Sequence, residues 1–533
     1  MLKKLTAIGV FVLAIAPSAY LAWTLRAMPH LGFYHDDSIY WVSAKSMAEG
    51  HDYRIASLPG QPYQTKYPPL YPALLALIWK MDPNFPSNLP LATLFAWLLL
   101  PVYLATVWAL LREYGFSWRE QCVLVLAAGW SPVAATFSFS LMPELLFTAL
   151  LVASVLLAER AIAEDAPAWL AILAGVCGAL AYLTKSAAGP LLLTAPLYFV
   201  WRKQFAKAGL FFAAMLPAVA GWQWWASRHV SHSWDLVTLY YTNYLGFQIY
   251  NVPLRDLPLV FWHNLDGFVL GAGKLLTFDV PYGAKALERV VAVAAIAGVV
   301  RLARRTKKLQ YPLAAVGISA LLMVWHYVPD QRFVFPLYPL LVAGLWTELT
   351  NVWQALRAAW KKPAAGERVI AYAGAGALAA LALFVGFTTC FGLFYFLPDL
   401  LGSYRDAFDS RKPAYEWIAR NAPIGANVFA YDDPLIYLYA GRKSCNLPIP
   451  PKLFYHNDDA GIDKLLHSIP DFAREYQLSY VLLTPSDFYR DLHEPGARHL
   501  AEAVENSGAF QPAFKTPSVA IYRFTAPVLA ATQ

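Results

Sequence analysis

The feature that most constrains this chain is a series of eleven long apolar runs. A helix needs about 20 apolar residues to cross a membrane, and most of these runs reach or approach that length. Only 14% of the residues are charged, whereas soluble domains carry roughly 25%. The sequence therefore predicts an α-helical polytopic membrane protein with about 11 transmembrane helices. The runs lie at about 5–25, 90–111, 121–138, 141–158, 168–184, 187–201, 208–226, 286–303, 311–328, 334–350 and 369–397.

Basic residues indicate the orientation of this bundle. Lys and Arg are frequent in one set of alternating short loops, and the other set holds only Lys185 and Arg332. Because cytoplasmic loops carry the excess of Lys and Arg, we expect a cytoplasmic N-terminus, and an odd number of spans then places the C-terminal region outside. The first apolar run is interpreted as an uncleaved anchor, since it continues to Trp23. These basic loops account for the net charge of +7 without a nucleic-acid surface.

Two long external loops and a C-terminal region complete the organisation. The loops, at about 26–89 and 227–285, are rich in Trp, Tyr and Pro, and we expect interfacial helices in them, including the segment Asp37–Met47. Residues 1–400 are predicted to form the transmembrane domain and residues 401–533 an external soluble α/β domain. In that domain the patterns predict helices at 413–421, 463–477 and 487–507 and strands at 426–431, 480–484 and 519–524.

Polar residues in the first external loop are the first candidates for chemistry. Asp36 and Asp37 open the segment, and Lys66 lies just before a Tyr-Pro-Pro sequence. A carboxylate at the membrane surface can act as a general base, and a helix N-cap is the alternative for one of the two acids. The lysine can bind an anionic phosphate, or it can be an ordinary interfacial lysine that reaches toward lipid headgroups.

Charged residues at other external turns face the same side. Glu144 begins a predicted membrane helix, where the helix dipole alone would favour an acid. Lys185 lies in a turn between two spans, and Arg332 binds either a phosphate or its neighbour Asp330. In the C-terminal region, the adjacent acids at 432 and 433 are interpreted as a helix cap with little functional weight.

In their order along the chain, these motifs resemble the GT-C glycosyltransferases, and among them the bacterial family 39 group. The motifs are the acidic pair, the lysine before Pro-Pro, the Pro-Glu at an outer helix start, the lysine in an outer turn and the arginine followed by FPLYPLL. Relatives in that group include protein O-mannosyltransferases and aminoarabinose transferases that modify lipid A. The resemblance covers roughly residues 1–400, with Asp37 where many relatives have Glu and with Tyr67 inserted before the prolines.

The resemblance implies an inverting transfer of a sugar from a polyprenyl-phosphate donor at the external face of the bacterial cytoplasmic membrane. It implies that Asp36 is the catalytic base. The residues expected to bind the substrate or the donor are Asp37, Lys66, Tyr67, Glu144, Lys185, His326 and Arg332. The acceptor is expected to be a hydroxyl of a lipid such as lipopolysaccharide, of a glycan or of a protein.

No cofactor is expected, and a divalent metal is not favoured because the sequence has no complete ligand set. The expected partners are the lipid-linked sugar, the acceptor and membrane lipid, without nucleic acid. The alternative function is a polytopic flippase or transporter of a lipid-linked sugar, which predicts inverted repeats and ionisable residues at mid-span depth. A membrane scaffold that presents the C-terminal domain is a third interpretation, and it leaves the clustering of Asp, Lys and Arg on one side unexplained.

Overall fold

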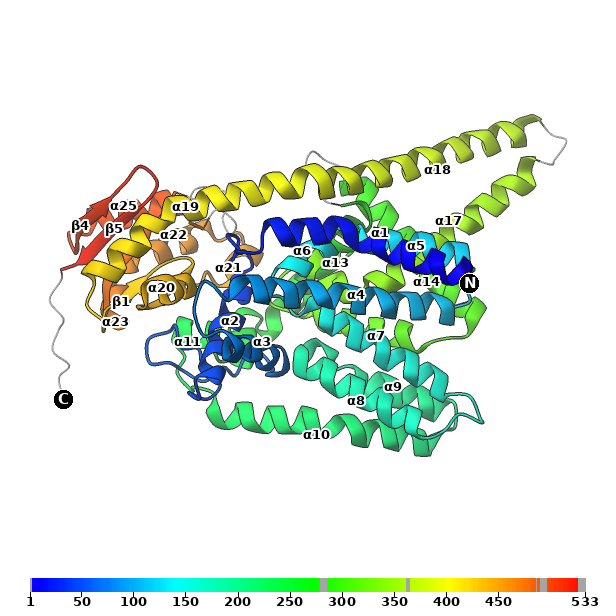
Figure 1. Ribbon diagram of the computed structural model, residues 1–533, viewed down its shortest axis with the longest axis horizontal. Helices are drawn as coiled ribbons and strands as arrows, with labels where there is room; N and C mark the ends of the chain where they lie inside the picture. Colours follow the sequence, from blue (N-terminus) through cyan, green and yellow to red (C-terminus); the bar gives the residue numbers. More distant parts are fainter. Residues whose placement is uncertain (1, 279–284, 361–364, 486, 489–495, 526–533) are drawn as a thin grey trace. The chain divides into compact units, whose positions relative to one another are not determined.

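The computed structural model describes residues 2–278, 285–360, 365–485, 487–488 and 496–525 (Figure 1). The chain divides into two compact units, each made of three segments. The first unit consists of Met1–Arg26, Thr93–Trp224 and Pro258–Asp399, and the second of Ala27–Ala92, Trp225–Leu257 and Leu400–Gln533.

The first unit is built from apolar helices. Its elements are α1 (Leu2–Thr24), α4 (Leu89–Glu113), α5 (Trp118–Gly129), α6 (Pro132–Phe139), α7 (Glu144–Ala161), α8 (Trp169–Thr184), η1 (Ser186–Ala188), α9 (Leu191–Trp201), α10 (Phe205–His229), α13 (Leu257–Thr277), α14 (Lys285–Thr306), α15 (Gln310–Met323), α16 (Gln331–Val334), η3 (Phe335–Leu337), α17 (Tyr338–Trp360), α18 (Ala365–Phe391) and the π-helix η4 (Gly392–Phe396).

Every apolar run that the sequence analysis identified contains a helix, so this chain is a multi-pass membrane protein of helical type. Among the described residues, five helices are long and apolar enough to cross a membrane, or six if the bent pair α5 and α6 is one span. The angle between α5 and α6 is 56°, and Ser131 and Pro132 between them supply the cap and the first residue of α6. The other helices of this unit are shorter or carry too many polar and charged residues for this criterion, and the number of eleven spans stays a prediction.

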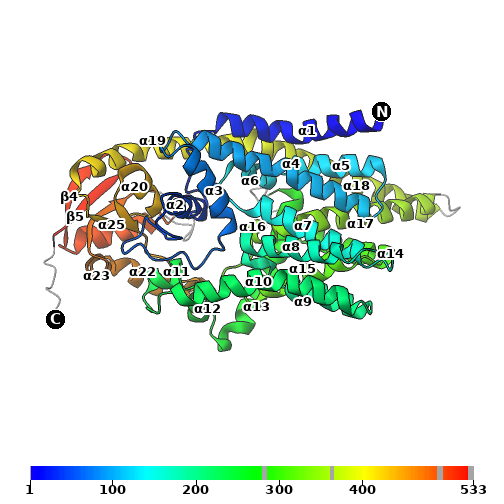
Figure 2. The ribbon, with the colours of Figure 1, turned by 60° about the horizontal axis from the view of Figure 1, so that its bottom comes forward.

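Small residues allow helices of the first unit to approach closely. α14 packs along α17, and α7 packs along α8 (Figure 2). A Cβ atom built on Gly298 of α14 would lie 1.9 Å from the carbonyl oxygen of Gly344 on α17. One built on Gly175 of α8 would lie 2.5 Å from the carbonyl oxygen of Phe211 on α10. Such backbone contact is typical of helices that associate within a membrane, where small residues make van der Waals packing possible.

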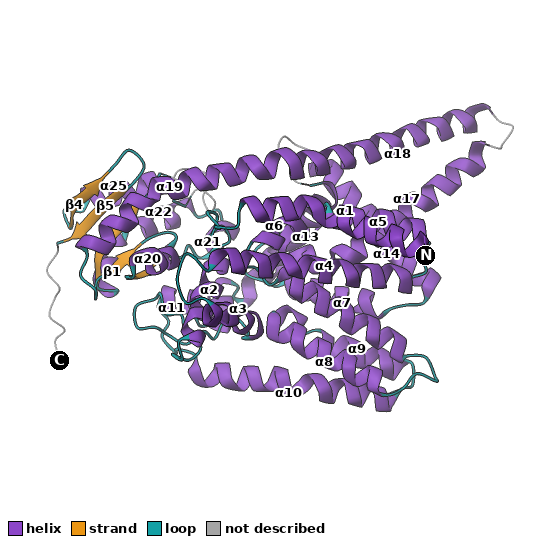
Figure 3. Ribbon diagram, viewed as in Figure 1, coloured by secondary structure: helices purple, strands orange, loops and turns teal. Residues whose placement is uncertain are grey.

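The second unit holds all the strands among the described residues (Figure 3). Its helices are α2 (Asp36–Ala48), α3 (Leu70–Met81), α11 (Leu236–Tyr241), α12 (Tyr244–Asn251), η2 (Leu254–Asp256), α19 (Leu397–Asn421), α20 (Asp433–Ala440), α21 (Pro451–Tyr455), α22 (Asp459–His467), α23 (Ile469–Glu475) and α25 (Gly496–Asn506). Its strands are β1 (Asn427–Phe429), β2 (Lys443–Cys445), β3 (Leu478–Leu483), β4 (Phe510–Lys515) and β5 (Ala520–Phe524).

The five strands form one mixed sheet in the order β2-β1-β3-β5-β4. β1 is parallel to both β2 and β3, and β5 is antiparallel to both β3 and β4. β3 is the buried centre of the sheet, and its apolar sequence LSYVLL suits a strand that is covered on both faces. The crossover from β1 to β2 contains α20, which ends at Gly441 in the left-handed conformation with φ +65°.

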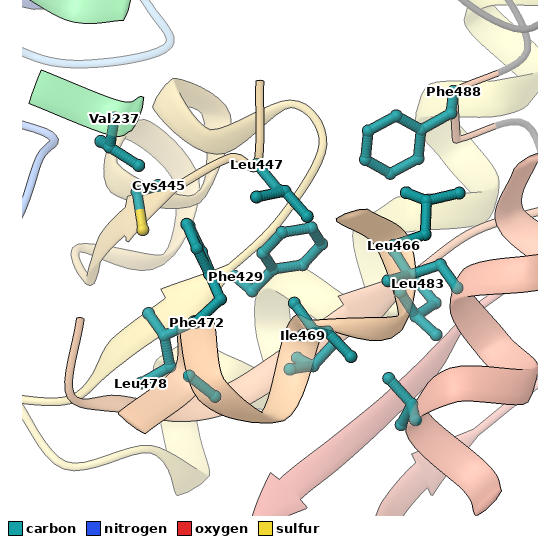
Figure 4. Close-up of a cluster of buried hydrophobic side chains, with 14 of the residues drawn as sticks. Val237, Phe429, Cys445, Leu447, Leu466, Ile469, Phe472, Leu478, Leu483 and Phe488 are labelled. Carbon is teal, nitrogen blue, oxygen red and sulfur yellow. The ribbon is translucent and has the colours of Figure 1, made fainter. Parts of the chain in front are cut away.

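One hydrophobic core joins the C-terminal region to both long loops. The core contains Ile39, Ile55 and Leu58 from residues 27–92 and Val237 and Tyr241 from residues 225–257. Figure 4 shows Val237 together with side chains of the C-terminal region. The other core members shown there are Phe429, Cys445, Leu447, Leu466, Ile469, Phe472, Leu478, Leu483 and Phe488. The sequence analysis assigned these loops to the transmembrane domain, whereas the structure groups them with the region after residue 400.

The prediction that residues 37–47 form an interfacial helix is wrong. This segment is helical, as α2, but it is buried on nearly all sides. Its aromatic residue Trp41 packs on Trp79 of α3, with ring centroids 4.7 Å apart, and accepts a hydrogen bond at its carbonyl from the Trp79 indole. Small residues such as Ser38, Ser43 and Ala44 allow neighbouring elements to approach closely, and nine of its thirteen residues are buried in the protein.

Three expected boundaries in the C-terminal region also differ. The helix expected at 413–421 is the end of α19, which begins at Leu397 and contains Pro413. The helix expected at 463–477 is divided into α22 and α23, because Pro470 suits the first turn of a new helix and disfavours the middle of a long one. The helix expected at 487–507 is confirmed from Gly496 to Asn506, and its part at 489–495 lies outside the described residues. The expected strands match β1, β3 and β5, and the short β2 and the polar β4 had no clear sequence signal.

Candidate functional site

The acidic pair lies at the first turn of α2. Asp36 is the first helical residue, and His35 occupies the cap position with φ +60°, where its side chain forms no cap hydrogen bond. The structure therefore does not make Asp36 the N-cap of α2. Instead, Asp36 is half-buried, and its Oδ1 accepts a hydrogen bond from the hydroxyl of Tyr67.

Tyr67 and Lys66 are brought to Asp36 by the extended segment before α3. Burial and the charge of Asp36 raise the pKa of Tyr67 well above its ordinary value, so the hydroxyl stays protonated and donates to the carboxylate. The half-buried ammonium group of Lys66 lies 4.3 Å from the ring centroid of Tyr240 and 5.2 Å from that of Tyr67. Aromatic faces attract a cation at this distance. A base, a hydroxyl and a cation therefore occupy one region of the second unit.

Asp37 has a different environment from Asp36. Its side chain is 1% exposed and accepts hydrogen bonds from the backbone N–H groups of Ser38, at 2.8 Å, and Gly32, at 3.2 Å. Burial raises the pKa of Asp37 to about 7, although these two hydrogen bonds act in the opposite direction. Asp37 thus holds the turn that precedes α2, and its assignment to substrate binding stays a prediction.

A buried network behind Asp36 escaped the sequence analysis. Asp433, the first residue of α20, is fully buried, and its Oδ1 lies 2.7 Å from Nε2 of His35. The same oxygen accepts a hydrogen bond of 2.8 Å from the hydroxyl of Tyr241. Nδ1 of His35 lies 3.2 Å from the hydroxyl of Tyr240. The interpretation of the acids at 432 and 433 as a cap is wrong, because the cap position of α20 forms no side-chain cap hydrogen bond.

His35 and Asp433 behave as a charged pair. Burial alone would lower the pKa of His35, but the hydrogen bond and the negative charge of Asp433 raise it above its ordinary value, with smaller contributions from Asp36 and Asp432. The protonated form of the imidazole, which directly precedes Asp36, is thereby favoured. The sequence signal for this pair was present, as a histidine directly before the acidic pair and an adjacent acidic pair in the C-terminal region, but no local pattern connects two residues 398 positions apart.

The second candidate cluster lies in the first unit and centres on Glu144, the first residue of α7. The carboxylate is fully buried. Its Oε1 accepts hydrogen bonds from Nζ of Lys185, at 2.9 Å, and from Nε of Arg332, at 2.8 Å. The backbone N–H of Arg332 donates to the side chain of Asp330, which caps α16. The charges of Arg332 and Lys185 also act on Asp330, so two basic and two acidic side chains lie in one cluster.

The remaining predicted residue, His326, is fully buried in the first unit. Its ring stacks on that of Trp325, with centroids 4.5 Å apart. The structure thus groups Asp36, Lys66 and Tyr67 in one unit and Glu144, Lys185 and Arg332 in the other. Within the part of the chain that the structure describes, no three His, Cys, Asp or Glu side chains are arranged to hold a metal ion, and the question of metal dependence stays a prediction.

Helical membrane segments, two long loops that share a core with a small α/β region, and this set of polar residues define a class of protein. The chain has the GT-C fold of membrane glycosyltransferases. Residues 66–225 match the family model described as dolichyl-phosphate-mannose-protein mannosyltransferase. This match includes Lys66, Tyr67, Glu144 and Lys185 among the candidate residues.

Two solved structures have the same fold over nearly the whole chain. The structure of ArnT from Cupriavidus metallidurans in the apo state is 14% identical, with a TM-score of 0.51, over 97% of this chain and 98% of that one. The archaeal oligosaccharyltransferase AglB from Archaeoglobus fulgidus, in complex with an inhibitory peptide and a dolichol-phosphate, is 13% identical, with a TM-score of 0.52, over 97% of this chain and 74% of that one. Among curated proteins, no sequence is similar enough to count as a match.

Proposed function

We propose that this chain is an inverting glycosyltransferase. It moves a sugar from a polyprenyl-phosphate donor to a hydroxyl of a lipid, glycan or protein acceptor at the external face of the bacterial cytoplasmic membrane. The observation that carries the proposal is the placement of Asp36, which is half-buried and bonded to the hydroxyl of Tyr67, whose ring centroid lies 5.2 Å from the ammonium group of Lys66.

In the proposed reaction Asp36 is the general base. The acceptor oxygen attacks the anomeric carbon, its proton passes to the Asp36 carboxylate, and the bond from that carbon to the phosphate oxygen breaks with its electron pair on the phosphate. A lipid phosphate leaves without needing a proton, so one carboxylate suffices, in contrast to the pair that glycosidases use. The hydroxyl of Tyr67 orients the carboxylate, and a positioned base commonly accelerates such a step by ~10²–10⁴-fold.

Cationic side chains are proposed to bind the donor phosphate as its negative charge develops. Lys66 is suited to this because its ammonium group lies over the rings of Tyr67 and Tyr240, which attract a cation. Lys185 and Arg332 are proposed to act on the same anion, and the buried carboxylate of Glu144 holds both side chains in place. His326 and Asp37 are proposed to shape the donor site. Preorganised charges of this kind stabilise the transition state without reorganising during the reaction.

The similar proteins support a lipid-linked donor. The matched family model carries the name of an enzyme that uses dolichyl-phosphate-mannose, and AglB binds a dolichol-phosphate in its structure. Both names contain a dolichol phosphate, which is a polyprenyl phosphate. The transfer of this chemistry to the present chain is part of the proposal, as are the bacterial inner membrane, the cytoplasmic N-terminus and the external C-terminal region.

The proposal is tested by incubating the purified full chain in lipid nanodiscs with a panel of synthetic undecaprenyl-phosphate sugars. Cell-envelope lipids serve as acceptors, and mass spectrometry measures both products. We expect release of undecaprenyl phosphate from one donor together with gain of that sugar by an acceptor. Movement of an intact donor across liposomes that contain the protein, without release of undecaprenyl phosphate, would instead support a flippase and contradict the proposal.

A further inference from the structure

The buried network of His35, Asp433, Tyr240 and Tyr241 has a place in the fold that stability does not explain. Asp433 is fully buried, and among the described residues its Oδ2 has no hydrogen-bond partner. A buried carboxylate with an unsatisfied oxygen costs free energy, and a buried ion pair is commonly no more stable than apolar residues of the same volume. The network therefore calls for a role other than holding the second unit together.

The position of His35 indicates what that role is. His35 directly precedes Asp36 and has φ +60° and ψ −49°, a backbone conformation that residues with a Cβ atom rarely adopt. Such a conformation costs of order 1–3 kcal/mol and persists only where surrounding contacts impose it. Here the contacts are on the ring, through Asp433 on one nitrogen and Tyr240 on the other. The carbonyl of His35 in turn accepts hydrogen bonds from the hydroxyl of Ser38, at 2.7 Å, and from the N–H of Ile39, at 3.2 Å, in the first turn of α2.

The network also contacts Lys66 through Tyr240. Tyr240 contacts His35 through its hydroxyl and Lys66 through its ring face. Its neighbour Tyr241 binds Asp433. A change at Asp433 can thus be transmitted to Asp36 through the backbone of His35 and to Lys66 through α11. Both routes start from α20, in the C-terminal region.

We propose that Asp433, acting through His35, is a positioning residue for Asp36, so that the C-terminal region sets the direction of the proposed catalytic base. This inference rests on the proposed function, because it assigns Asp433 to the same site. Asp433 itself does not touch the reacting atoms. Its role is to keep the ring of His35 in one orientation and thereby the carboxylate of Asp36 in one direction.

The proposal predicts a particular dependence on pH. The groups that face His35 are Asp36 and Asp37 on α2, Asp432 and Asp433 at the start of α20, and the hydroxyls of Tyr240 and Tyr241 on α11. Because Asp433 favours the protonated imidazole, removal of its charge lowers the pKa of His35. The alkaline limb of the kcat profile should then move to lower pH, because an opposite charge at this distance favours the charged form of the imidazole.

The test compares Asp433→Asn with Asp487→Asn in the purified full chain. Asp487 is a matched control, because it is a buried carboxylate of the same region that binds Thr484 and Arg411 instead of His35. For Asp433→Asn we expect kcat to fall by ~10–100-fold, since a hydrogen bond to a charged group contributes ~1.5–3 kcal/mol. Asp487→Asn should keep the wild-type kcat and pH profile.

The single variant His35→Gln and the double variant His35→Gln, Asp433→Asn complete a double-mutant cycle. The double variant should lose no more kcat than the more impaired single variant, because the two residues act as one unit.

A second measurement does not depend on transfer. Hydrogen–deuterium exchange of peptides that cover residues 34–41 reports the first turn of α2 directly. We expect faster exchange in Asp433→Asn and wild-type exchange in Asp487→Asn. Wild-type protection of this turn in Asp433→Asn would overturn the inference whether or not a donor is found. A wild-type kcat in Asp433→Asn would also overturn the inference. If the wild-type chain transfers sugar from none of the donors, the proposed function is contradicted. In that case the hydrogen–deuterium exchange result alone decides the inference.

Discussion

Asp36 and Asp37 are adjacent in sequence, yet the structure gives them opposite environments. Asp36 is half-buried and bonded to a side-chain hydroxyl, and Asp37 is enclosed and bonded to backbone N–H groups. A general base must reach its substrate and be ionised when it acts. Burial, which raises the pKa of Asp37 to about 7, works against both requirements. Burial and hydrogen-bond partners thus distinguish two acids that look alike in the sequence.

A first prediction concerns the effect of Asp37 on stability. Its pKa is near 3.8 in the unfolded chain and about 7 in the folded one, so between these values the folded state binds the extra proton. Stability therefore falls as pH rises through this range and levels off above it. Relative to Asp37→Asn, the wild type should lose melting temperature from pH 5 to pH 7 and little more by pH 8. Parallel melting curves for the two proteins over this range would show that Asp37 is not buried as described.

A second prediction concerns the proposed phosphate ligands. Lys66→Met and Arg332→Met keep much of the apolar stem of each side chain and remove the charge. Each should raise the donor KM by ~10–100-fold, because charge-assisted hydrogen bonds are the strong ones. Lys464→Met, at an exposed position of α22, is the control and should behave as wild type. Unchanged kinetics over a range of donor concentrations in both variants would remove these two residues from the donor site.

At the scale of elements, several helices of the first unit pack with their backbones in direct contact at glycine residues. Gly298 on α14 leaves room for the carbonyl of Gly344 on α17, whereas Gly209 on α10 has no heavy atom within 4 Å of the place where a Cβ would lie. The two glycines have the same sequence context, each within an apolar helix. Their packing differs, and this difference sets their tolerance to substitution.

The prediction that follows is a comparison of two Gly→Ala variants. Gly298→Ala must push α14 and α17 apart and should cost ~1–3 kcal/mol, the usual cost of overpacking. Gly209→Ala should be neutral or slightly stabilising, because alanine is the better helix former. Thermal unfolding in detergent measures both variants. Equal stability of the two would contradict the close contact between α14 and α17.

Elements also show which parts of the fold can be read from the sequence. Apolar runs identify the membrane helices, since length and hydropathy alone define them. The burial of α2 could not be predicted, because its Ser and Ala residues are compatible with either lipid or protein on each face. The short strand β2 consists of Lys443, Ser444 and Cys445 and becomes a strand only through its pairing with β1.

The same limit applies to the candidate site. Asp36, Lys66 and Glu144 stand in recognisable local patterns, whereas the ion pairs of Glu144 with Lys185 and Arg332 are seen only in the structure. Asp433 lacked any such pattern, because its partner His35 lies in another segment and only the fold brings the two together. Contacts between residues far apart in the sequence depend on the tertiary structure, which a local motif does not predict.

At the scale of the whole molecule, orientation in the membrane is the property on which the proposed site depends. The charge of alternating loops predicts a cytoplasmic N-terminus and an external C-terminal region. In a cysteine-free background, a cysteine at Ser507 should react with a membrane-impermeant maleimide in intact spheroplasts, and one at Lys307 should react only after lysis. Labelling of position 307 and not of position 507 in intact spheroplasts would reverse the topology and with it the location of the site.

The central claim is that Asp36 is the base of a glycosyl transfer, and one measurement tests it most directly. The rate of sugar transfer is measured for the purified chain and for Asp36→Asn with a defined undecaprenyl-phosphate sugar. Asparagine keeps the shape of the side chain and can still accept the hydrogen bond of Tyr67, but it cannot take a proton. We predict a normally folded variant whose transfer rate falls by ~10²–10⁴-fold, while Asp37→Asn retains substantial activity. Near-wild-type transfer by Asp36→Asn would contradict the account and shift the assignment of the base to Asp37.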